Sequence, residues 1–389
     1  MILYPPNSGV PDRAERFLLQ FPLHEPVAPA SKALVIAFHP FGVSEKSPFN
    51  ATALPFLCAQ KRYLLLAPYG LVDTNYACAP SQQALDAILA LLGKWIAYDK
   101  ERVYAIGFSM GGLNALSYAA RHQDPAATRI AALIDHTGTA DPIRAYQQGG
   151  AELKALLEDP LHFGGSPTSA SYAWQRIAPV RIGSQGVEPL TAQVENLLHV
   201  PMWIHWNPAD PFQDLVHQTV TLRNWLILQG AQVQSSTAVG TLQHAWSTLP
   251  MEQAFEWLDD QLLATPPAAF RAHRDAPGGH FEQELRDSVP QQVARWRFDG
   301  TGPTLRVRDT LAVRELAFDP HSYGGGAALT LELSGLDANF ARLVLLAQPN
   351  APAQVQALTG PAPLWFHDPQ RAELTLLPQG PSQVLSIVP

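Results

Sequence analysis

The chain has 389 residues, which is long for a single hydrophobic core and predicts two domains. Hydrophobic residues make up 47% of it and charged residues 15%, a composition typical of a globular protein. The 26 Lys and Arg residues against 34 Asp and Glu give a net charge of −8. This charge argues against nucleic-acid binding, because contact with phosphates requires a basic surface.

The N-terminal residues 1–6 have neither the basic n-region nor the apolar h-region of a signal peptide. We therefore expect a cytoplasmic protein, with secretion as the alternative if a leader has been removed. No apolar run approaches the roughly 20 residues that cross a bilayer, so no membrane span is expected. The two cysteines, Cys58 and Cys78, are too few for a disulfide framework and are interpreted as small buried hydrophobic residues.

Strand-like and helix-like segments alternate through the first two-thirds of the chain, as a mostly parallel sheet with crossover helices requires. Continuous apolar runs predict buried strands, whereas apolar residues at every third or fourth position predict an amphipathic helix. The predicted strands are 33–38, 63–67, 102–106, 130–134, 201–206 and 231–239, and the predicted helices are 81–95, 113–121, 215–228 and one that follows Pro250.

Two stretches depart from this alternation. Residues from about 140 to 199 have little strand character, and we interpret them as a lid or cap inserted over the site, the alternative being a surface excursion without a role. From about residue 270 onward, short segments alternate with period two between Gly/Pro-rich turns, which predicts an antiparallel all-β domain. The predicted domains are therefore an α/β domain over 1–265 and a small β-sandwich-like domain over 270–389.

The pattern G-x-S-x-G occurs at residues 107–111, with Ser109 at its centre. An apolar strand directly precedes it and a helical pattern directly follows it. A serine on such a tight strand-to-helix turn projects its hydroxyl above the sheet, and the flanking glycines relieve crowding of the strained backbone. We therefore predict that Ser109 is a catalytic nucleophile, the alternative being a glycine-rich structural turn.

A serine nucleophile needs a base and a carboxylate that orients it, and in this architecture they follow in the order serine, acid, histidine. Asp210 lies in the loop after the predicted strand 201–206, and His244 lies in the loop after the strand 231–239. They are the predicted acid and base. Asp135, which follows an earlier strand, is a competing acid, and Asp214 is more simply a helix-capping residue.

The oxyanion of the tetrahedral intermediate needs two backbone donors. The N–H of Met110, the residue after the nucleophile, is the first candidate. The second should come from the loop after strand 33–38, where Pro40 has no N–H to donate. Phe41 is the candidate there, with Gly42 as the alternative. A simple turn that ends the strand is the structural interpretation of the same residues.

Aromatic residues flank the predicted acid and base, namely Trp206, Phe212 and Trp246. If they face the cleft, the substrate has an apolar or aromatic part; the alternative is core packing. No H-E-x-x-H, C-x-x-C or carboxylate cluster indicates a metal site, and no G-x-G-x-x-G follows a predicted strand. Neither a metal nor a cofactor is expected.

The segment 99–112, which leads through the predicted strand into the serine motif, resembles the α/β-hydrolase superfamily, in particular its esterase and prolyl-oligopeptidase-like branch. It looks like the approach to the nucleophile in polyhydroxybutyrate-depolymerase-like and feruloyl-esterase-like proteins. The resemblance covers roughly residues 30–265. It implies an α/β-hydrolase fold with Ser109, Asp210 and His244 as the triad. The loop 39–42 departs from the His-Gly of many relatives, and the β domain is no part of the family fold.

These inferences together predict a serine hydrolase, most simply a carboxylesterase that acts through a Ser109 acyl-enzyme on a small-molecule or polymeric ester. A serine peptidase or amidase is one alternative, although an ester has the better leaving group. The other is a polymer- or carbohydrate-binding protein that acts through its C-terminal β domain. The sequence does not indicate the oligomeric state.

Overall fold

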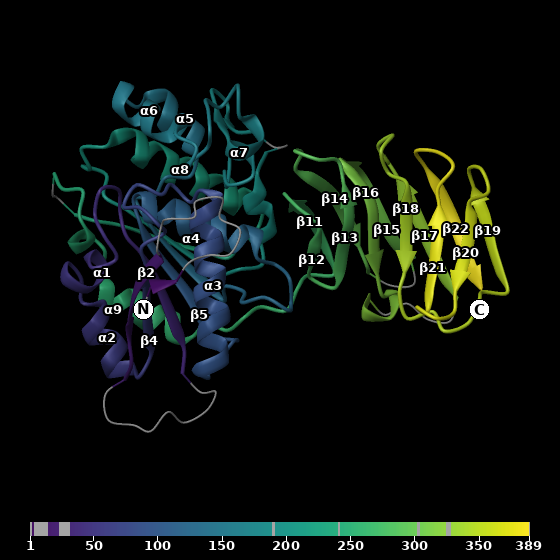
Figure 1. Cartoon of the computed structure of the whole chain (residues 1–389), viewed down its shortest axis with the longest axis horizontal. Helices are drawn as coiled ribbons and strands as arrows, with labels where there is room; N and C mark the ends of the chain where they lie inside the picture. The colour runs from purple at the N-terminus through teal and green to yellow at the C-terminus, as the bar shows by residue number, and fades with distance from the viewer. Residues whose placement is uncertain are drawn as a thin grey trace. The chain divides into compact units, whose positions relative to one another are not determined.

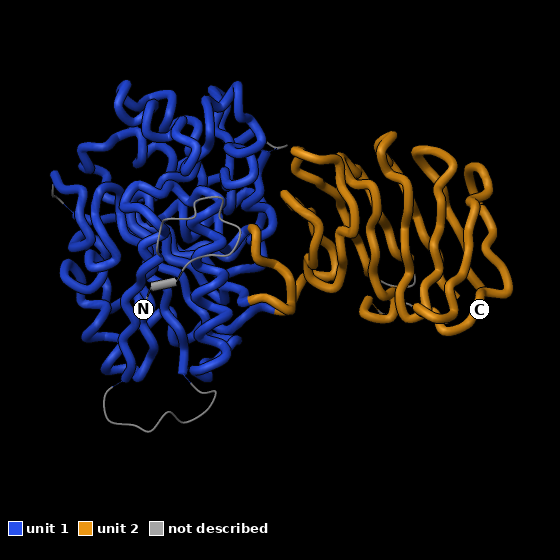
Figure 2. The backbone as a smooth tube through the Cα atoms, in the orientation of Figure 1, with its two compact units in different colours: residues 1–120, 128–264 blue, residues 121–127, 265–389 orange. Residues whose placement is uncertain are grey.

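The computed structural model describes residues 2–3, 15–22, 32–188, 191–239, 242–301, 304–323 and 328–388. The chain divides into two compact units, one of residues 1–120 and 128–264 and the other of residues 121–127 and 265–389 (Figure 2). No pattern in the sequence marks the segment 121–127 as part of the C-terminal unit. It is bound there by the ion pair of Arg121 with Asp275, at 2.8 Å, and by the N–H of Phe281, which donates to Gln123 O at 2.9 Å.

An eight-stranded sheet in the order β1-β2-β4-β3-β5-β6-β9-β10 forms the centre of the first unit (Figure 1). The strands from β4 to β10 pair in parallel, whereas β2 pairs antiparallel with both β1 and β4. This is the strand order of the α/β-hydrolase fold, so the expected fold of this unit is confirmed. The bounds are β1 Ile2–Leu3, β2 Glu15–Gln20, β3 Leu34–Phe38, β4 Leu64–Pro68, β5 Val103–Phe108, β6 Ala132–His136, β9 Met202–Trp206 and β10 Val233–Thr237.

Helices cover both faces of this sheet. Apolar residues of α3, α4 and α8 pack on one face, and those of α2 and α9 pack on the other. Because both faces are buried, the central strands are continuous apolar runs rather than alternating ones. The helices are α1 Ser47–Asn50, α2 Leu54–Lys61, α3 Ala79–Trp95, α4 Met110–Arg121, α8 Gln213–Leu228 and α9 Met251–Asp259, with the short η2 Trp246–Thr248 before α9.

Strand β3 illustrates how one sequence serves two cores. Leu34, Ile36 and Phe38 join the cluster with α3, α4 and α8, whereas Val35 and Ala37 join the cluster with α2 and α9. This division follows from the period of two residues in a strand. The sheet is therefore held between two apolar layers, and its carboxyl-end loops are left to carry polar residues.

The stretch 140–199, whose sequence has little strand character, folds into short helices and one two-stranded hairpin. They are α5 Pro142–Gln148, α6 Ala151–Glu158, α7 Ser171–Gln175, the hairpin of β7 Ile182–Gly183 and β8 Gly186–Val187, and η1 Gln193–Leu197. The buried Asp141 caps α5 by accepting hydrogen bonds from Ile143 and Arg144, and its other oxygen accepts from the N–H of Ile182 at 2.7 Å. One carboxylate thus ties two distant parts of the insertion together.

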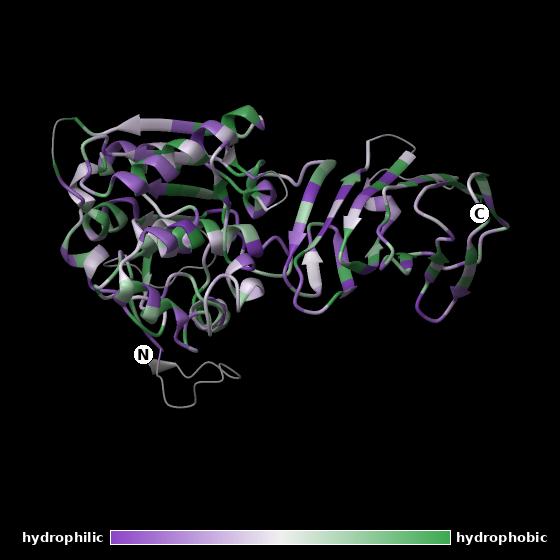
Figure 3. Ribbon diagram, turned by 90° about the horizontal axis from the view of Figure 1, so that it is seen from above, coloured by the Kyte–Doolittle hydropathy of each residue, from purple (hydrophilic) through white to green (hydrophobic). Residues whose placement is uncertain are grey.

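The C-terminal unit contains the expected all-β region, formed by two six-stranded sheets. The prediction that this region is antiparallel is wrong in part, because β15 (Thr304–Leu311) pairs in parallel with β17 (Leu329–Ser334), and β16 (Val313–Phe318) pairs in parallel with β18 (Arg342–Leu345). Buried and exposed residues alternate along strands such as β17 and β22, and hydrophilic and hydrophobic residues follow one another along the strands in Figure 3. Both sheets contribute to one hydrophobic core. The strands are β11 Ala269–Arg274, β12 Gly278–His280, β13 Gln283–Ser288, β14 Ala294–Asp299, β15 Thr304–Leu311, β16 Val313–Phe318, β17 Leu329–Ser334, β18 Arg342–Leu345, β19 Gln354–Thr359, β20 Leu364–Asp368, β21 Glu373–Leu377 and β22 Gln383–Val388, with η3 Pro320–Tyr323 between β16 and β17.

Candidate active site

Ser109 stands on the turn between β5 and α4, with a φ of 57°. A residue with a side chain is strained in this left-handed region, so the surrounding structure has to hold it there. The N–H of Ser109 donates to His136 O at 3.1 Å, and its carbonyl accepts from the N–H groups of Gly112 and Thr139 at 2.9 and 3.0 Å. The backbone of the predicted nucleophile is therefore fixed by its own helix and by the end of β6.

The motif needs glycine at these positions because a side chain there would clash with neighbouring atoms. A Cβ on Gly107 would lie 2.0 Å from Gly111 O, and a Cβ on Gly111 would lie 2.1 Å from Phe38 O. A Cβ on Gly112 would lie 2.1 Å from the carboxylate of Asp135. Because the first two contacts involve backbone atoms, a side chain could be accommodated only by moving the turn itself.

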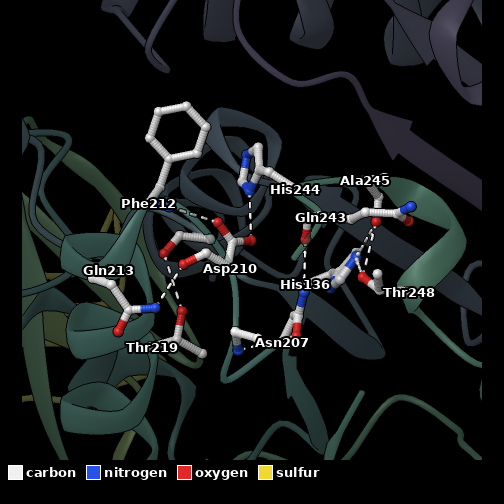
Figure 4. Close-up of polar contacts among 12 residues, drawn as sticks. His136, Asn207, Asp210, Phe212, Gln213, Thr219, Gln243, His244, Ala245 and Thr248 are labelled. Carbon is white, nitrogen blue, oxygen red and sulfur yellow. Dashed lines mark hydrogen bonds and ion pairs between the residues drawn. The ribbon is translucent and has the colours of Figure 1, made fainter. Parts of the chain in front are cut away.

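The predicted acid and base form a hydrogen-bonded pair (Figure 4). His244 Nδ1 lies 2.7 Å from Asp210 Oδ2, and the second carboxylate oxygen accepts from the N–H of Phe212 at 2.8 Å. The imidazole packs between two rings, with centroid distances of 4.4 Å to Phe108 and 4.8 Å to Phe212. Since Phe108 directly precedes Ser109, the structure brings His244 beside the nucleophile turn.

The competing carboxylates have other surroundings. Asp135 lies against Gly112 and Gly138, whereas the next residue, His136, stacks on Phe108 at 4.7 Å. Neighbouring side chains of a strand point to opposite faces. Asp135 therefore lies on the face of the sheet opposite to His136, Phe108 and His244. Asp214 does not cap its helix as expected; it forms an ion pair with Arg144 at 2.7 Å.

The loop after β3 lies against the N-terminus of α4, because Gly111 is close to the carbonyl groups of Phe38 and His39. Met110 is the first residue of α4, so its N–H has no acceptor within the helix. The N–H of Gly42 donates to Asp73 O at 2.9 Å. Because the N–H of Gly42 is already bonded, the N–H of Phe41 is the remaining candidate for the second oxyanion donor in this loop.

The aromatic residues near the pair divide into two kinds. Trp246 is 4% exposed and packs under Phe108 in the core, and Trp206 is half-buried against the core on the other face of the sheet. Both tryptophans therefore occupy positions that core packing explains. Phe212 and Phe41, by contrast, are 56% and 42% exposed.

The insertion packs on α4, the helix that follows Ser109. Ile143, Phe163 and Trp174 share one apolar cluster with Met110 and Leu113 of α4. The helices α5, α6 and α7 gather beyond the N-terminal end of α4 in Figure 1. This position is compatible with the predicted lid, which stays a prediction.

Two further histidines lie behind the pair. Neither His136 nor His205 was expected at the site, because His136 precedes the predicted acid in the chain and His205 lies inside a predicted strand. Both are buried, and their rings are 5.1 Å apart. Burial lowers the pKa of His136 to about 3 and that of His205 to about 4, so both rings are neutral at ordinary pH. A histidine in an otherwise apolar strand was the only available signal.

The described part of the chain also bears on metal binding, on membrane spans and on the state of the two cysteines. No group of three or more His, Cys, Asp or Glu is placed there to hold a metal ion. None of the described helices has the length and apolar character needed to cross a membrane. Cys58 and Cys78 are free and buried, and burial raises the pKa of the Cys78 thiol to about 11.

Comparison with known proteins gave structural matches only. No protein-family model and no curated protein sequence matches the chain. A fluorophosphonate-binding serine hydrolase of Staphylococcus aureus is 11% identical, with 66% of this chain and 96% of that chain covered and a TM-score of 0.48. An S-formylglutathione hydrolase from Agrobacterium tumefaciens is 13% identical, with 67% and 93% covered and a TM-score of 0.46.

A third match is the MPT51 protein of Mycobacterium tuberculosis, which is 16% identical, with 67% of this chain and 96% of that chain covered and a TM-score of 0.48. Serine hydrolases, esterases among them, are thus the proteins that the chain resembles. The fold assignment rests on the strand order and on the turn at Ser109.

The crowding at the turn leads to a first prediction. Gly111→Ala should lower the free energy of unfolding by on the order of 3 kcal/mol or more, because its Cβ would clash with the carbonyl of Phe38. Gly93→Ala is the matched control, because Gly93 lies in α3 with nothing near its Cβ position. The control should gain about 0.5 to 1 kcal/mol from helix propensity. Denaturant unfolding measures both, and equal effects would contradict the steric argument.

Asp135 generates a second prediction. It is fully buried, and neither carboxyl oxygen has a hydrogen-bond partner among the described residues, so burial raises its pKa to about 7. The folded state keeps this proton up to about pH 7, whereas the unfolded state releases it near pH 4, so the wild type loses stability as the pH rises through that window. Asp135→Asn removes the loss. The unfolding free energy of Asp135→Asn should therefore rise relative to that of the wild type by on the order of 2 kcal/mol between about pH 5 and pH 8.

Urea unfolding at the two pH values checks this prediction. The same substitution at Asp260, which is exposed at the end of α9, is the control and should leave the pH dependence of stability unchanged. If Asp135→Asn shows no gain at the higher pH relative to this control, the buried carboxyl does not carry the pH dependence.

Proposed function

We propose that the first unit is a serine esterase in which Ser109 is the nucleophile, His244 the general base and Asp210 the carboxylate that orients the base. The hydrogen bond of 2.7 Å between His244 and Asp210 carries the proposal, because it joins two residues expected to act together from separate loops. The contact of His244 with Phe108, next to the strained Ser109, supports it further.

The pair supports a definite proton assignment. A carboxylate can only accept, so His244 Nδ1 carries the hydrogen and donates it to Asp210. Nε2 is then the basic nitrogen. It takes the hydroxyl proton of Ser109 as the oxygen attacks the ester carbonyl, and Asp210 stabilises the imidazolium that forms.

The same groups then complete the acylation of Ser109 and carry out its deacylation. The imidazolium gives its proton to the departing alkoxide, which leaves an acyl group on Ser109. His244 then takes a proton from a water molecule as the water oxygen attacks the acyl-enzyme, and it returns this proton to Ser109 Oγ as the bond to the acyl group breaks and the acid is released. The N–H groups of Met110 and Phe41 are the proposed donors to the oxyanion, and the N-terminus of α4 adds its positive partial charge there.

An ester with an apolar or aromatic part is the proposed substrate. Phe212 and Phe41 support this choice, because they are large, exposed rings on loops that carry proposed site residues. An ester alcohol is also a better leaving group than an amine. We propose no catalytic role for the C-terminal unit and no metal or other cofactor in the reaction.

Hydrolysis of p-nitrophenyl esters of increasing acyl length tests this function. We expect turnover with a preference for an apolar acyl chain, and Ser109→Ala should lower kcat by at least about 10⁴-fold because it removes the nucleophile. A fluorophosphonate probe, which phosphonylates a nucleophilic serine with loss of fluoride, should label the wild type and not the variant. Labelling without ester turnover would count against the esterase assignment, and labelling retained in Ser109→Ala would exclude Ser109 as the nucleophile.

The acid is tested by a pair of variants four positions apart. Asp210→Asn should lower kcat by about 10² to 10⁴-fold, because the amide no longer fixes the tautomer of His244 or stabilises the imidazolium. Asp214→Asn makes the same chemical change in a residue that pairs with Arg144 instead, and should keep kcat within about three-fold. Steady-state kinetics with one ester measures both, and a comparable loss in the two variants would argue against Asp210 as the acid.

A further inference from the structure

His136 contacts both the nucleophile turn and the loop of the base. Its own carbonyl accepts the N–H of Ser109 at 3.1 Å, and its ring stacks on Phe108 with a centroid distance of 4.7 Å. On its other side, Nε2 lies 3.0 Å from the carbonyl oxygen of Ala245, the residue after His244 (Figure 4). A carbonyl only accepts, so Nε2 carries the hydrogen and donates it.

We propose that His136 is a positioning residue that sets the placement of the base His244 relative to the nucleophile Ser109. The inference rests on the proposed function, because it concerns the same reaction. His136 would touch neither the substrate nor the reacting atoms. It acts by joining the residue that follows the base to the residues that form the nucleophile turn.

The loop that carries His244 is held at two of its carbonyl groups, those of Gln243 and Ala245. Asn207 Nδ2 donates to Gln243 O at 2.7 Å, on the near side of His244. Thr248 Oγ1 donates to Ala245 O at 2.9 Å, on the far side. Among these donors, His136 is the one that is also bonded to the backbone of Ser109. The hydrogen bond from His136 therefore links two loops that the sequence separates by about 135 residues.

The surroundings of His136 keep this donor constant. The ring is fully buried between Phe108, His205 and Trp246, and none of its described contacts is with an acidic side chain. Burial, and then the neighbouring His205, lower its pKa to about 3. The ring of His136 is therefore neutral at any pH well above this value, and its Nε2 keeps one hydrogen to donate.

A buried histidine that merely satisfies its hydrogen bonds would affect stability alone. A positioning residue would affect catalysis, because a displacement of about 1 Å between reacting groups can cost about 10²-fold in rate. The effect should fall on kcat and leave KM nearly unchanged, since His136 lies behind the turn and is fully buried. These two outcomes can be separated by variants of the same site.

The experiment compares His136→Phe with His136→Gln in the full-length chain. Phe keeps a ring to stack on Phe108 but has no donor, whereas the amide nitrogen of Gln occupies nearly the place of Nε2. We expect His136→Phe to lower kcat for a p-nitrophenyl ester by about 30- to 100-fold with KM changed by less than about two-fold. Labelling by the fluorophosphonate probe should slow by a similar factor. His136→Gln should recover most of both losses.

His199→Phe is the control, because His199 is a half-buried histidine before the amino end of β9, at the opposite edge of the sheet from the site. It should keep kcat within about three-fold. If His136→Phe fails to fold, Thr248→Val is the substitute variant, because the Thr248 hydroxyl lies 3.1 Å from His136 Nε2 and donates to the same Ala245 O. It should lower kcat by about three- to ten-fold at constant KM, because the ring of His136 loses the neighbour that holds its donor against that carbonyl.

The inference would be overturned if folded His136→Phe keeps the wild-type kcat, or if His136→Gln is as impaired as His136→Phe. It would also be overturned if Thr248→Val keeps full kcat where that variant replaces His136→Phe. If the wild-type chain neither hydrolyses esters nor takes the label, the proposed function itself is overturned. This outcome can be distinguished from failure of the inference on His136 alone, in which the wild type is active and His136→Phe is equally active.

Discussion

The proposed site of the first unit depends on the strained backbone of Ser109, which has a φ of 57°. Strain of this kind persists only where the neighbouring structure leaves the chain no alternative. Here β5 ends directly before Ser109, at the carboxyl end of the sheet, and α4 begins directly after it. The carbonyl of His136, on the next strand, accepts the N–H of Ser109. Gly107 allows the turn to close tightly on the start of α4, and Gly111 allows the loop after β3 to approach that start.

Much of this could be predicted from the sequence, because the signals are local. The apolar runs of β3, β5 and β9 and the glycine spacing around Ser109 each occupy a few consecutive residues. The pairing of Asp210 with His244 could be inferred from chain order, since parallel strands place their carboxyl-end loops at one edge of the sheet. The tryptophans show the limit of that argument, because closeness in sequence to a catalytic loop does not distinguish a core ring from one that lines a cleft.

Other features depend on contacts between distant residues and have no local pattern. The segment 121–127 joins the C-terminal unit through Arg121 and Gln123, whose partners lie more than 150 residues away. As a consequence, residues 270–389 by themselves lack part of that unit, and the intact chain is the appropriate material for studying it. The order within the insertion is likewise set by a distant bond, that of Asp141 with the N–H of Ile182.

The register between β5 and β6 determines what stands behind the proposed site. Phe108 is paired with His136, and His136 is paired with His205 on β9, so these three rings share one face of the sheet. Asp135 is paired with Gly107 and therefore lies on the opposite face. A shift of one residue would exchange the two side chains and put an unpartnered carboxyl behind Phe108 and His244. The proposed acid–base pair therefore depends on strand register as well as on the two loops that carry it.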